Sequence, residues 1–103
     1  MIPLQKPLSR DSVVKILREH KVELAQFHIS FLGLFGSVAR DEAGPESDVD
    51  LLVSFDEPVG FFHLVRVQQF LESILRSKVD LVPQDALRKE FRDQVMKEVI
   101  RAA

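Results

Sequence analysis

The chain of 103 residues is long enough for one domain with one hydrophobic core. Hydrophobic residues make up 46% of it and charged residues 29%, the balance of a protein that folds rather than remaining disordered. The net charge of −2 argues against a long basic face for nucleic acid, and the absence of cysteine excludes disulfides and thiolate metal sites. Because we find neither a leader pattern nor a membrane-spanning apolar run, we expect a cytoplasmic protein that binds no membrane.

The first third of the sequence predicts an extended arm, a helix and a strand. Residues 1–8 carry two prolines and no periodicity, which is typical of an arm. Ser9 is suited to cap a helix over residues 10–27, where apolar residues recur at helical spacing. Residues 28–36 form a nearly continuous apolar run that ends at a glycine, which indicates a central strand covered on both faces.

The rest of the chain alternates strands and helices. After a short helix in residues 37–42, residues 47–55 predict a second strand and residues 61–77 an amphipathic helix. Residues 78–83 predict a third strand, and apolar residues at every fourth position predict a C-terminal helix over 87–100. The fold class is therefore α/β, with three or four strands in one sheet packed with helices. The connection between the first two strands fits a parallel or an antiparallel pair.

Two aspartates stand at the mouth of the second predicted strand. Side chains alternate along a strand, so Asp48 and Asp50 share one face with Cα atoms about 6.6 Å apart. Two like charges about 4 Å apart at a protein surface repel by roughly 4 kcal/mol, and a divalent cation between them reverses the sign of that energy. Asp80 lies among apolar residues of the third strand. If the second and third strands are neighbours, three carboxylates meet.

Gly36 and Ser37 lie where the first strand gives way to the short helix. Glycine permits positive φ and close backbone approach, and free N–H groups at a helix start attract phosphate. Aspartate in a turn and serine as a helix cap are each ordinary. Their order along the chain nevertheless favours one site, in which the Gly-Ser turn binds a polyphosphate and the carboxylates hold the accompanying Mg²⁺.

At these residues the chain resembles the minimal nucleotidyltransferases of the DNA polymerase β superfamily. The shared motif is Gly36-Ser37, then Asp48-Val49-Asp50, then the third carboxylate, Asp80, on a later strand. The resemblance covers roughly residues 25–100 and implies a small mixed sheet in a single domain. The size of the chain is most similar to the antitoxin partners of HEPN-domain toxins, in pairs of type VII. Members of that group are understood to transfer AMP from ATP to a tyrosine of the toxin, within a hetero-oligomer.

The resemblance also implies residue roles. Asp48 and Asp50 would bind two Mg²⁺ ions, and Asp80 would bind the second ion and accept the proton of the acceptor hydroxyl. Gly36 and Ser37 would hold the β- and γ-phosphates of ATP while pyrophosphate leaves.

Two residues near this motif have less specific roles. Arg40 follows Ser37 by about one helical turn, so it is placed to reach a phosphate or a partner, or it is a solvated surface arginine. Family members often carry glycine where this chain has Asp41.

Other conspicuous residues favour packing over chemistry. Three histidines show no spacing typical of metal ligands, namely His20, His28 and His63. His63 fits helix packing, and Phe61 and Phe62 fit a core or an interface. The apolar stripe over residues 87–100 fits the core, or alternatively a partner surface.

Three functions remain open from the sequence. The first is Mg²⁺-dependent transfer of AMP from ATP to a partner protein. The second is a non-catalytic partner that inhibits a toxin by binding alone. The third is the catalytic subunit of an enzyme that modifies a small hydroxyl compound such as an aminoglycoside.

Overall fold

The computed structural model describes residues 8–44 and 47–103, and four strands of this part form one mixed sheet in the order β3-β2-β1-β4. The pairs β1–β2 and β1–β4 are antiparallel, whereas β2 and β3 run parallel. The strands are β1 (Ile29–Phe35), β2 (Val49–Phe55), β3 (Val79–Pro83) and β4 (Ile100–Arg101). The predicted α/β class with a mixed sheet is confirmed. The arm predicted for residues 1–8 lies, apart from Leu8, outside the described residues.

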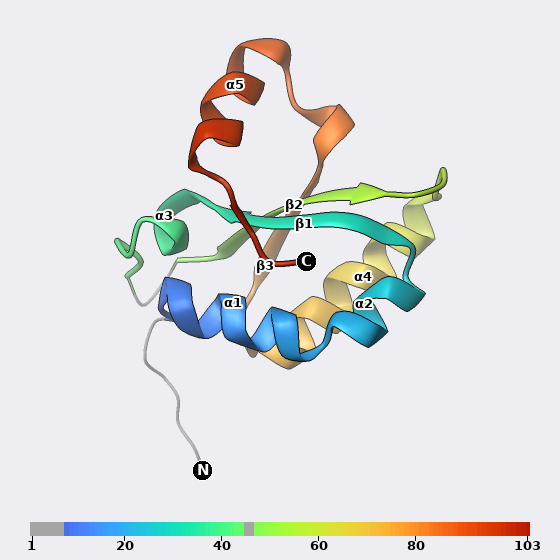
Figure 1. The fold of residues 1–103 in the computed structure, drawn as a ribbon, viewed down its shortest axis with the longest axis horizontal. Coiled ribbons are helices and arrows are strands. Elements are labelled where there is room, and N and C mark those ends of the chain that lie inside the picture. The colour runs from blue at the N-terminus through green and yellow to red at the C-terminus, as the bar shows by residue number, and fades with distance from the viewer. Residues whose placement is uncertain (1–7, 45–46) are drawn as a thin grey trace.

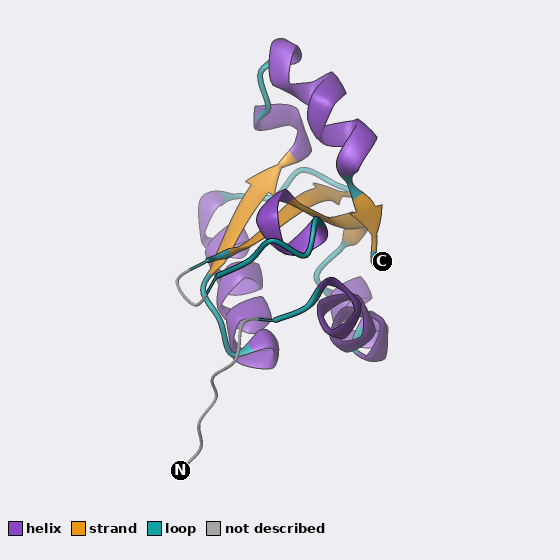
Figure 2. Cartoon of the chain, turned by 90° about the vertical axis from the view of Figure 1, so that its left-hand side faces the viewer, coloured by secondary structure: helices purple, strands orange, loops and turns teal. Residues whose placement is uncertain are grey.

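Helices cover the two faces of the sheet unequally. Figures 1 and 2 show α1, α2 and α4 on one side of the sheet and α5 rising from the other. No helix of the described ranges is long and apolar enough to cross a membrane. The helices are α1 (Arg10–Glu19), α2 (Lys21–Gln26), α3 (Gly36–Ala39), α4 (Phe61–Leu75), the 3-10 turn η1 (Gln84–Ala86) and α5 (Lys89–Glu98).

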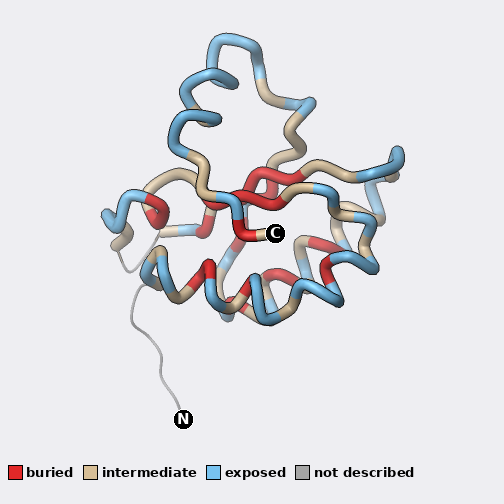
Figure 3. Tube along the Cα trace, viewed as in Figure 1, coloured by how far each residue is buried: buried red, intermediate tan, exposed pale blue. Residues whose placement is uncertain are grey.

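The hydrophobic core lies between the sheet and the layer of α1, α2 and α4 (Figure 3). Alternate residues of the central strands point into it, and each fully buried leucine or valine contributes about 1.5–3 kcal/mol. Fully buried members are Leu32, Leu34, Leu51 and Val53 from the sheet, Val13 and Leu17 from α1, and Val67 and Leu71 from α4. The opposite face of the sheet is therefore free to carry polar residues.

The predicted helices differ from the structure at their boundaries, and the short helix expected over 37–42 is α3, which spans Gly36–Ala39. The helix expected over 10–27 is divided at His20, whose ring Nδ1 lies 2.8 Å from the carbonyl oxygen of Ile16. The helix expected over 61–77 ends at Leu75, because Arg76 adopts a left-handed conformation with φ 54°.

The C-terminal segment corrects two expectations. The helix predicted over 87–100 ends at Glu98, and Ile100 belongs to β4 because its backbone pairs with Leu34 of β1. The expectation that the stripe is core is wrong for α5, which contains no buried residue and whose Phe91 is 54% exposed, whereas Ile100 at the end of the stripe packs against the core. The stripe leaves the core because α5 lies on the far side of the sheet, away from the other long helices.

The paired phenylalanines at the start of α4 also lie outside the core. Phe61 and Phe62 are 72% and 75% exposed, and their rings contact each other edge to face. Of the two alternatives predicted for them, the core is therefore excluded and the interface remains.

Asp41 occupies a position that is suited to glycine. Its φ is 56°, and its carboxylate accepts the backbone N–H of Arg10 at 3.0 Å, in the first turn of α1. A second carboxylate oxygen lies 3.6 Å from the Arg10 guanidinium. Aspartate tolerates the left-handed backbone conformation at this position, and its carboxylate also accepts a hydrogen bond that glycine cannot accept.

Changes at Asp41 are expected to separate these two contributions. Asp41→Gly removes only the carboxylate and should cost about 1 kcal/mol, the value of a helix-terminal bond. Asp41→Ala adds the strain of a left-handed alanine, and its total cost should be larger by about another 1 kcal/mol. Urea unfolding of both variants measures the difference. Equal stability of the two would show that the left-handed backbone is not what restricts this position.

Candidate active site

The sheet register brings two of the predicted aspartates side by side. Asp50 of β2 pairs directly with Asp80 of β3 in the parallel ladder. Their neighbours on either side, including Val49 and Leu51, point into the core, so both aspartates face the α5 side of the sheet. Asp48 is exposed one residue before β2 begins. The structure therefore places all three carboxylates around the amino ends of two adjacent strands.

Gly36 lies against the Asp50 carboxylate. In the antiparallel ladder Asp50 pairs with Phe35, the residue before Gly36. A Cβ atom on Gly36 would lie 2.1 Å from Oδ2 of Asp50, and the φ of Gly36 is +78°. Both the close approach and the left-handed backbone require glycine here. Ser37 follows in the first turn of α3, and no side-chain hydrogen bond engages its hydroxyl within the described residues.

The electrostatics of the site centre on Asp50. Burial raises the pKa of Asp50 above its ordinary value of 3.8, and repulsion from Asp80 and Asp48 raises it further. The positive charge of Arg40 acts in the opposite direction on the same pKa. The charge of Asp50 in β2 is thus affected by three other groups, which lie at the C-cap of α3, in the turn before β2 and in β3. The carboxylates carry an excess of negative charge that Arg40 alone does not balance.

These three aspartates form an open arrangement of oxygen donors. Within residues 8–44 and 47–103, the one group of three possible metal ligands whose ligand atoms all lie within 4.8 Å of one another is elsewhere, at His28, Asp56 and Glu57. Carboxylate oxygens are the ligands that Mg²⁺ prefers, and a partly buried carboxylate with a raised pKa gains most from a cation. The donor set fits magnesium.

Arg40 joins α3 to α5. Its Nε donates to Glu42 at 3.0 Å and its Nη1 donates to Glu98 at 3.1 Å. The hydrogen bond with Glu42 is the main cause that raises the pKa of Arg40. The side chain for which the sequence left a phosphate, a partner or solvent open is therefore engaged by two glutamates in this structure.

The sequence did not predict the glutamate partners of Arg40. Glu98 is 58 residues away in the chain, and no local pattern links it to Arg40. The helix predicted over residues 87–100 gave no indication that its end returns to α3.

The packing role predicted for His63 is confirmed, whereas the contacts of His28 were not predicted. His63 packs as predicted, because its Nε2 lies 2.7 Å from the carbonyl oxygen of Phe27 and its ring contacts Phe27 and Phe55 edge to face. His28 lies between Asp56 and Glu57, a cluster that depends on the pairing of β1 with β2 and that spacing along the chain does not reveal. That cluster is at the opposite end of β2 from Asp50.

Comparison with known proteins matches this chain to one family. Residues 12–102 match the family model of the nucleotidyltransferase domain. The protein adenylyltransferase MntA of Thermococcus cleftensis is 36% identical over 94 residues, which cover 90% of this chain and 95% of that protein.

Solved structures share the fold. A structure of a candidate minimal nucleotidyltransferase is 34% identical, with a TM-score of 0.79, and the match covers 93% of this chain and 98% of that chain. The complex of tri-AMPylated HEPN toxin with MNT antitoxin from Shewanella oneidensis contains a chain with a TM-score of 0.64 and 20% identity, over 87% of this chain and 71% of that one. Because the family match spans almost all of the sequence and the fold agrees, the chain belongs to the nucleotidyltransferase domain family.

Proposed function

We propose that this protein transfers the adenylyl group of ATP to a hydroxyl of a partner protein, with Mg²⁺ as cofactor. The observation that carries the proposal is the Asp50 carboxylate, which lies beside Asp80 in the sheet register and against the backbone of Gly36. This contact joins the three-carboxylate group to the Gly-Ser turn. The likeness to a protein adenylyltransferase supports the choice of ATP and of a protein acceptor.

The residues of the site have distinct tasks in this reaction. Asp48 and Asp50 would hold two Mg²⁺ ions, and Asp80 would hold the second. When bound, the ions neutralise phosphate charge and lower the pKa of the acceptor hydroxyl. Gly36 and Ser37 would hold the β- and γ-phosphates through backbone N–H groups and the serine hydroxyl.

The bonds of the transfer balance without a covalent enzyme intermediate. The acceptor oxygen forms a bond to the α-phosphorus, and the bond from that phosphorus to the pyrophosphate oxygen breaks. Asp80, which is exposed and next to Asp50, takes the hydroxyl proton. Most of the acceleration then comes from positioning and from the neutralised charge of the phosphates.

A partner protein is expected to supply the acceptor. A groove of about 790 Å³ lies at the opposite end of β2 from Asp50, and none of the three aspartates lines it. A HEPN toxin with an acceptor tyrosine fits this requirement, because the Shewanella complex is described as a tri-AMPylated toxin with its antitoxin. The exposed apolar side chains of α5 lie on the same side of the sheet as the aspartates. We therefore propose that this chain is an antitoxin of that kind, in a hetero-oligomer.

Intact mass measurement tests this function. The co-expressed HEPN partner should gain one or more AMP units on incubation with this chain, ATP and Mg²⁺, and none with the Asp48→Asn variant. Labelling of an aminoglycoside instead of the partner would replace this function by small-molecule transfer. Equal neutralisation of the toxin by wild type and Asp48→Asn would show inhibition by binding alone.

Arg40 is expected to move from its glutamates to the triphosphate. Arg40→Gln should raise the KM for ATP by roughly tenfold, the value of one charge-assisted contact. Glu98→Gln, which releases the guanidinium from α5 without removing it, should leave the KM unchanged or lower it. Steady-state kinetics of both variants distinguish the roles. A KM raised equally by both would mean that the arginine only ties α3 to α5.

The α5 surface is expected to bind the partner. Phe91→Ser should weaken the complex at least tenfold, because an exposed aromatic side chain is the type of residue that dominates protein interfaces. Val22→Ser is the matched control, since Val22 is 64% exposed on α2, beyond the other face of the sheet. Calorimetric titration with the partner measures both. Equal losses, or no loss with Phe91→Ser, would place the interface elsewhere.

A further inference from the structure

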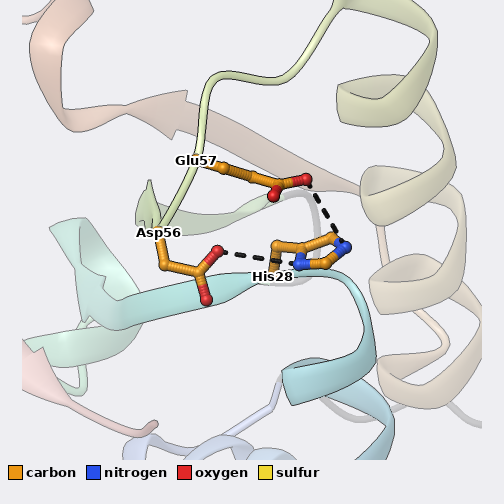
Figure 4. Close-up of side chains that lie close together, drawn as sticks. All are labelled: His28, Asp56 and Glu57. Carbon is orange, nitrogen blue, oxygen red and sulfur yellow. Dashed lines mark ion pairs between the residues drawn. The ribbon is translucent and has the colours of Figure 1, made fainter.

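A second group of metal-ligating side chains lies at the far end of the β1–β2 pair, away from the aspartates. His28 precedes β1, and Asp56 and Glu57 follow β2 (Figure 4). The backbone N–H of Asp56 donates to the carbonyl oxygen of His28 at 2.9 Å, next to the ladder pair formed by Ile29 and Phe55. The sheet itself therefore holds the histidine opposite the two carboxylates.

The distances in this cluster are close to those of a bound ion. His28 Nδ1 lies 3.6 Å from Asp56 Oδ1, and His28 Nε2 lies 3.6 Å from Glu57 Oε2. One ligand atom from each residue can be chosen so that all three lie within 4.8 Å of one another. Ligands at about 2.0–2.1 Å from a tetrahedral ion are about 3.3 Å apart. The two carboxylates lie beside different ring nitrogens, so binding of one ion requires these side chains, which are 48–59% exposed, to rotate until both carboxylates face the same nitrogen.

The charge of the cluster calls for a cation. In the part of the chain that the structure describes, the ion pairs of Asp56 and Glu57 are both with His28. Metal binding requires the imidazole in its neutral form, and Asp56 and Glu57 then carry two negative charges that one divalent ion neutralises. This donor set differs from the all-oxygen aspartate site because it includes an imidazole nitrogen. Imidazole suits zinc-like transition metals, whereas Mg²⁺ takes oxygen ligands.

The cluster also opens onto a cavity. Asp56 and Glu57 line the groove of about 790 Å³, together with Gln84 and Arg92. A zinc ion with three protein ligands keeps a coordination position for water or a ligand. His63 is the nearest further imidazole, with its ring centre 6.2 Å from that of His28, but its Nε2 is engaged by Phe27. The free position of the ion would therefore be available to the solvent or to a molecule in the groove.

We propose that His28, Asp56 and Glu57 form a binding site for a divalent transition-metal ion of the zinc type. The site is separate from the aspartates of nucleotidyl transfer and does not depend on that activity. Its three ligands leave one position open beside the groove.

Calorimetric titration of the full chain with Zn²⁺, in excess Mg²⁺ to occupy the aspartates, tests this site. The wild type should bind one Zn²⁺ per chain. His28→Gln and Glu57→Gln should each weaken that binding at least tenfold. Asp85→Asn is the matched control, because Asp85 lines the same groove outside the cluster, and it should change Zn²⁺ affinity less than twofold.

Histidine NMR provides a second measurement that does not depend on a variant. Zn²⁺ should shift the ring signals of His28 and leave those of His20 and His63 in place. The proposal is overturned if the wild type binds no Zn²⁺ in excess Mg²⁺, or if the His28 signals stay unchanged. Equal affinity of wild type and folded His28→Gln, or an equal loss with Asp85→Asn, would overturn it as well.

Discussion

Replacing Asp50 with asparagine is expected to abolish adenylyl transfer and, at the same time, to stabilise the protein. The rate should fall on the order of 10³-fold or more, because the variant loses a central carboxylate of the site that neutralises the triphosphate. The stability gain follows from the raised pKa of Asp50, which shows that the folded protein disfavours this charge. The gain should stay within about 1 kcal/mol, since the carboxylate is only partly buried and solvent screens its repulsion.

The gain in stability from Asp50→Asn has a defined pH dependence. The folded state holds the Asp50 proton to higher pH than the unfolded state, so wild-type stability falls as pH rises from 3.8 through the raised pKa. Asparagine carries no charge. The extra stability of Asp50→Asn over the wild type is therefore complete above the raised pKa of Asp50 and absent below pH 3.8. Thermal melts without divalent cations, at acidic and neutral pH, measure this. Asp85→Asn should change neither the activity nor this pH profile. A melting temperature at neutral pH that is lower for Asp50→Asn than for the wild type would contradict the account.

Gly36→Ala is expected to have the second largest effect, because it disturbs backbone and catalytic carboxylate together. The new Cβ would lie 2.1 Å from Asp50 Oδ2, so the carboxylate must move. A displacement of about 1 Å in an active site costs roughly 10²-fold in rate. The left-handed backbone, with φ +78°, adds about 1–2 kcal/mol of destabilisation.

Gly44→Ala is the control for this change. Among residues 8–44 and 47–103, no atom beyond the glycine and its chain neighbours lies within 4 Å of the position of its added Cβ, and its φ is outside the left-handed region. Chemical unfolding and a turnover assay of both variants should therefore separate them. Gly36→Ala with wild-type turnover would show that the contact between Gly36 and Asp50 has no part in catalysis.

Much of the site could be predicted from the sequence because its determinants are local. Alternation along a strand places Asp48 and Asp50 on one face, and an aspartate in an apolar run marks Asp80. The direct pairing of Asp50 with Asp80 needed the strand order, which the residues alone left open. The need for glycine at position 36 was expected from its turn, whereas its contact with the Asp50 carboxylate depends on the antiparallel register.

The remaining features depend on long-range contacts. β4 is two residues long and forms only because Ile100 and Arg101 find the free edge of β1. The stripe of α5 has the period of a core helix, and nothing in that period shows that the helix crosses to the other face of the sheet. The bond from Arg40 to Glu98 and the cluster of His28 with Asp56 and Glu57 likewise join residues that only the fold brings together.

The central claim is that three aspartates and the Gly-Ser turn form one site for a metal-bound triphosphate. A crystal structure with Mn²⁺ and a non-hydrolysable ATP analogue tests it most directly, because manganese is located by its anomalous scattering. We predict manganese held by Asp48 and Asp50, Asp80 facing the same ion pair, and the triphosphate against Gly36 and Ser37. Manganese and triphosphate bound away from these residues, for example in the groove beside Gln84, would contradict the account.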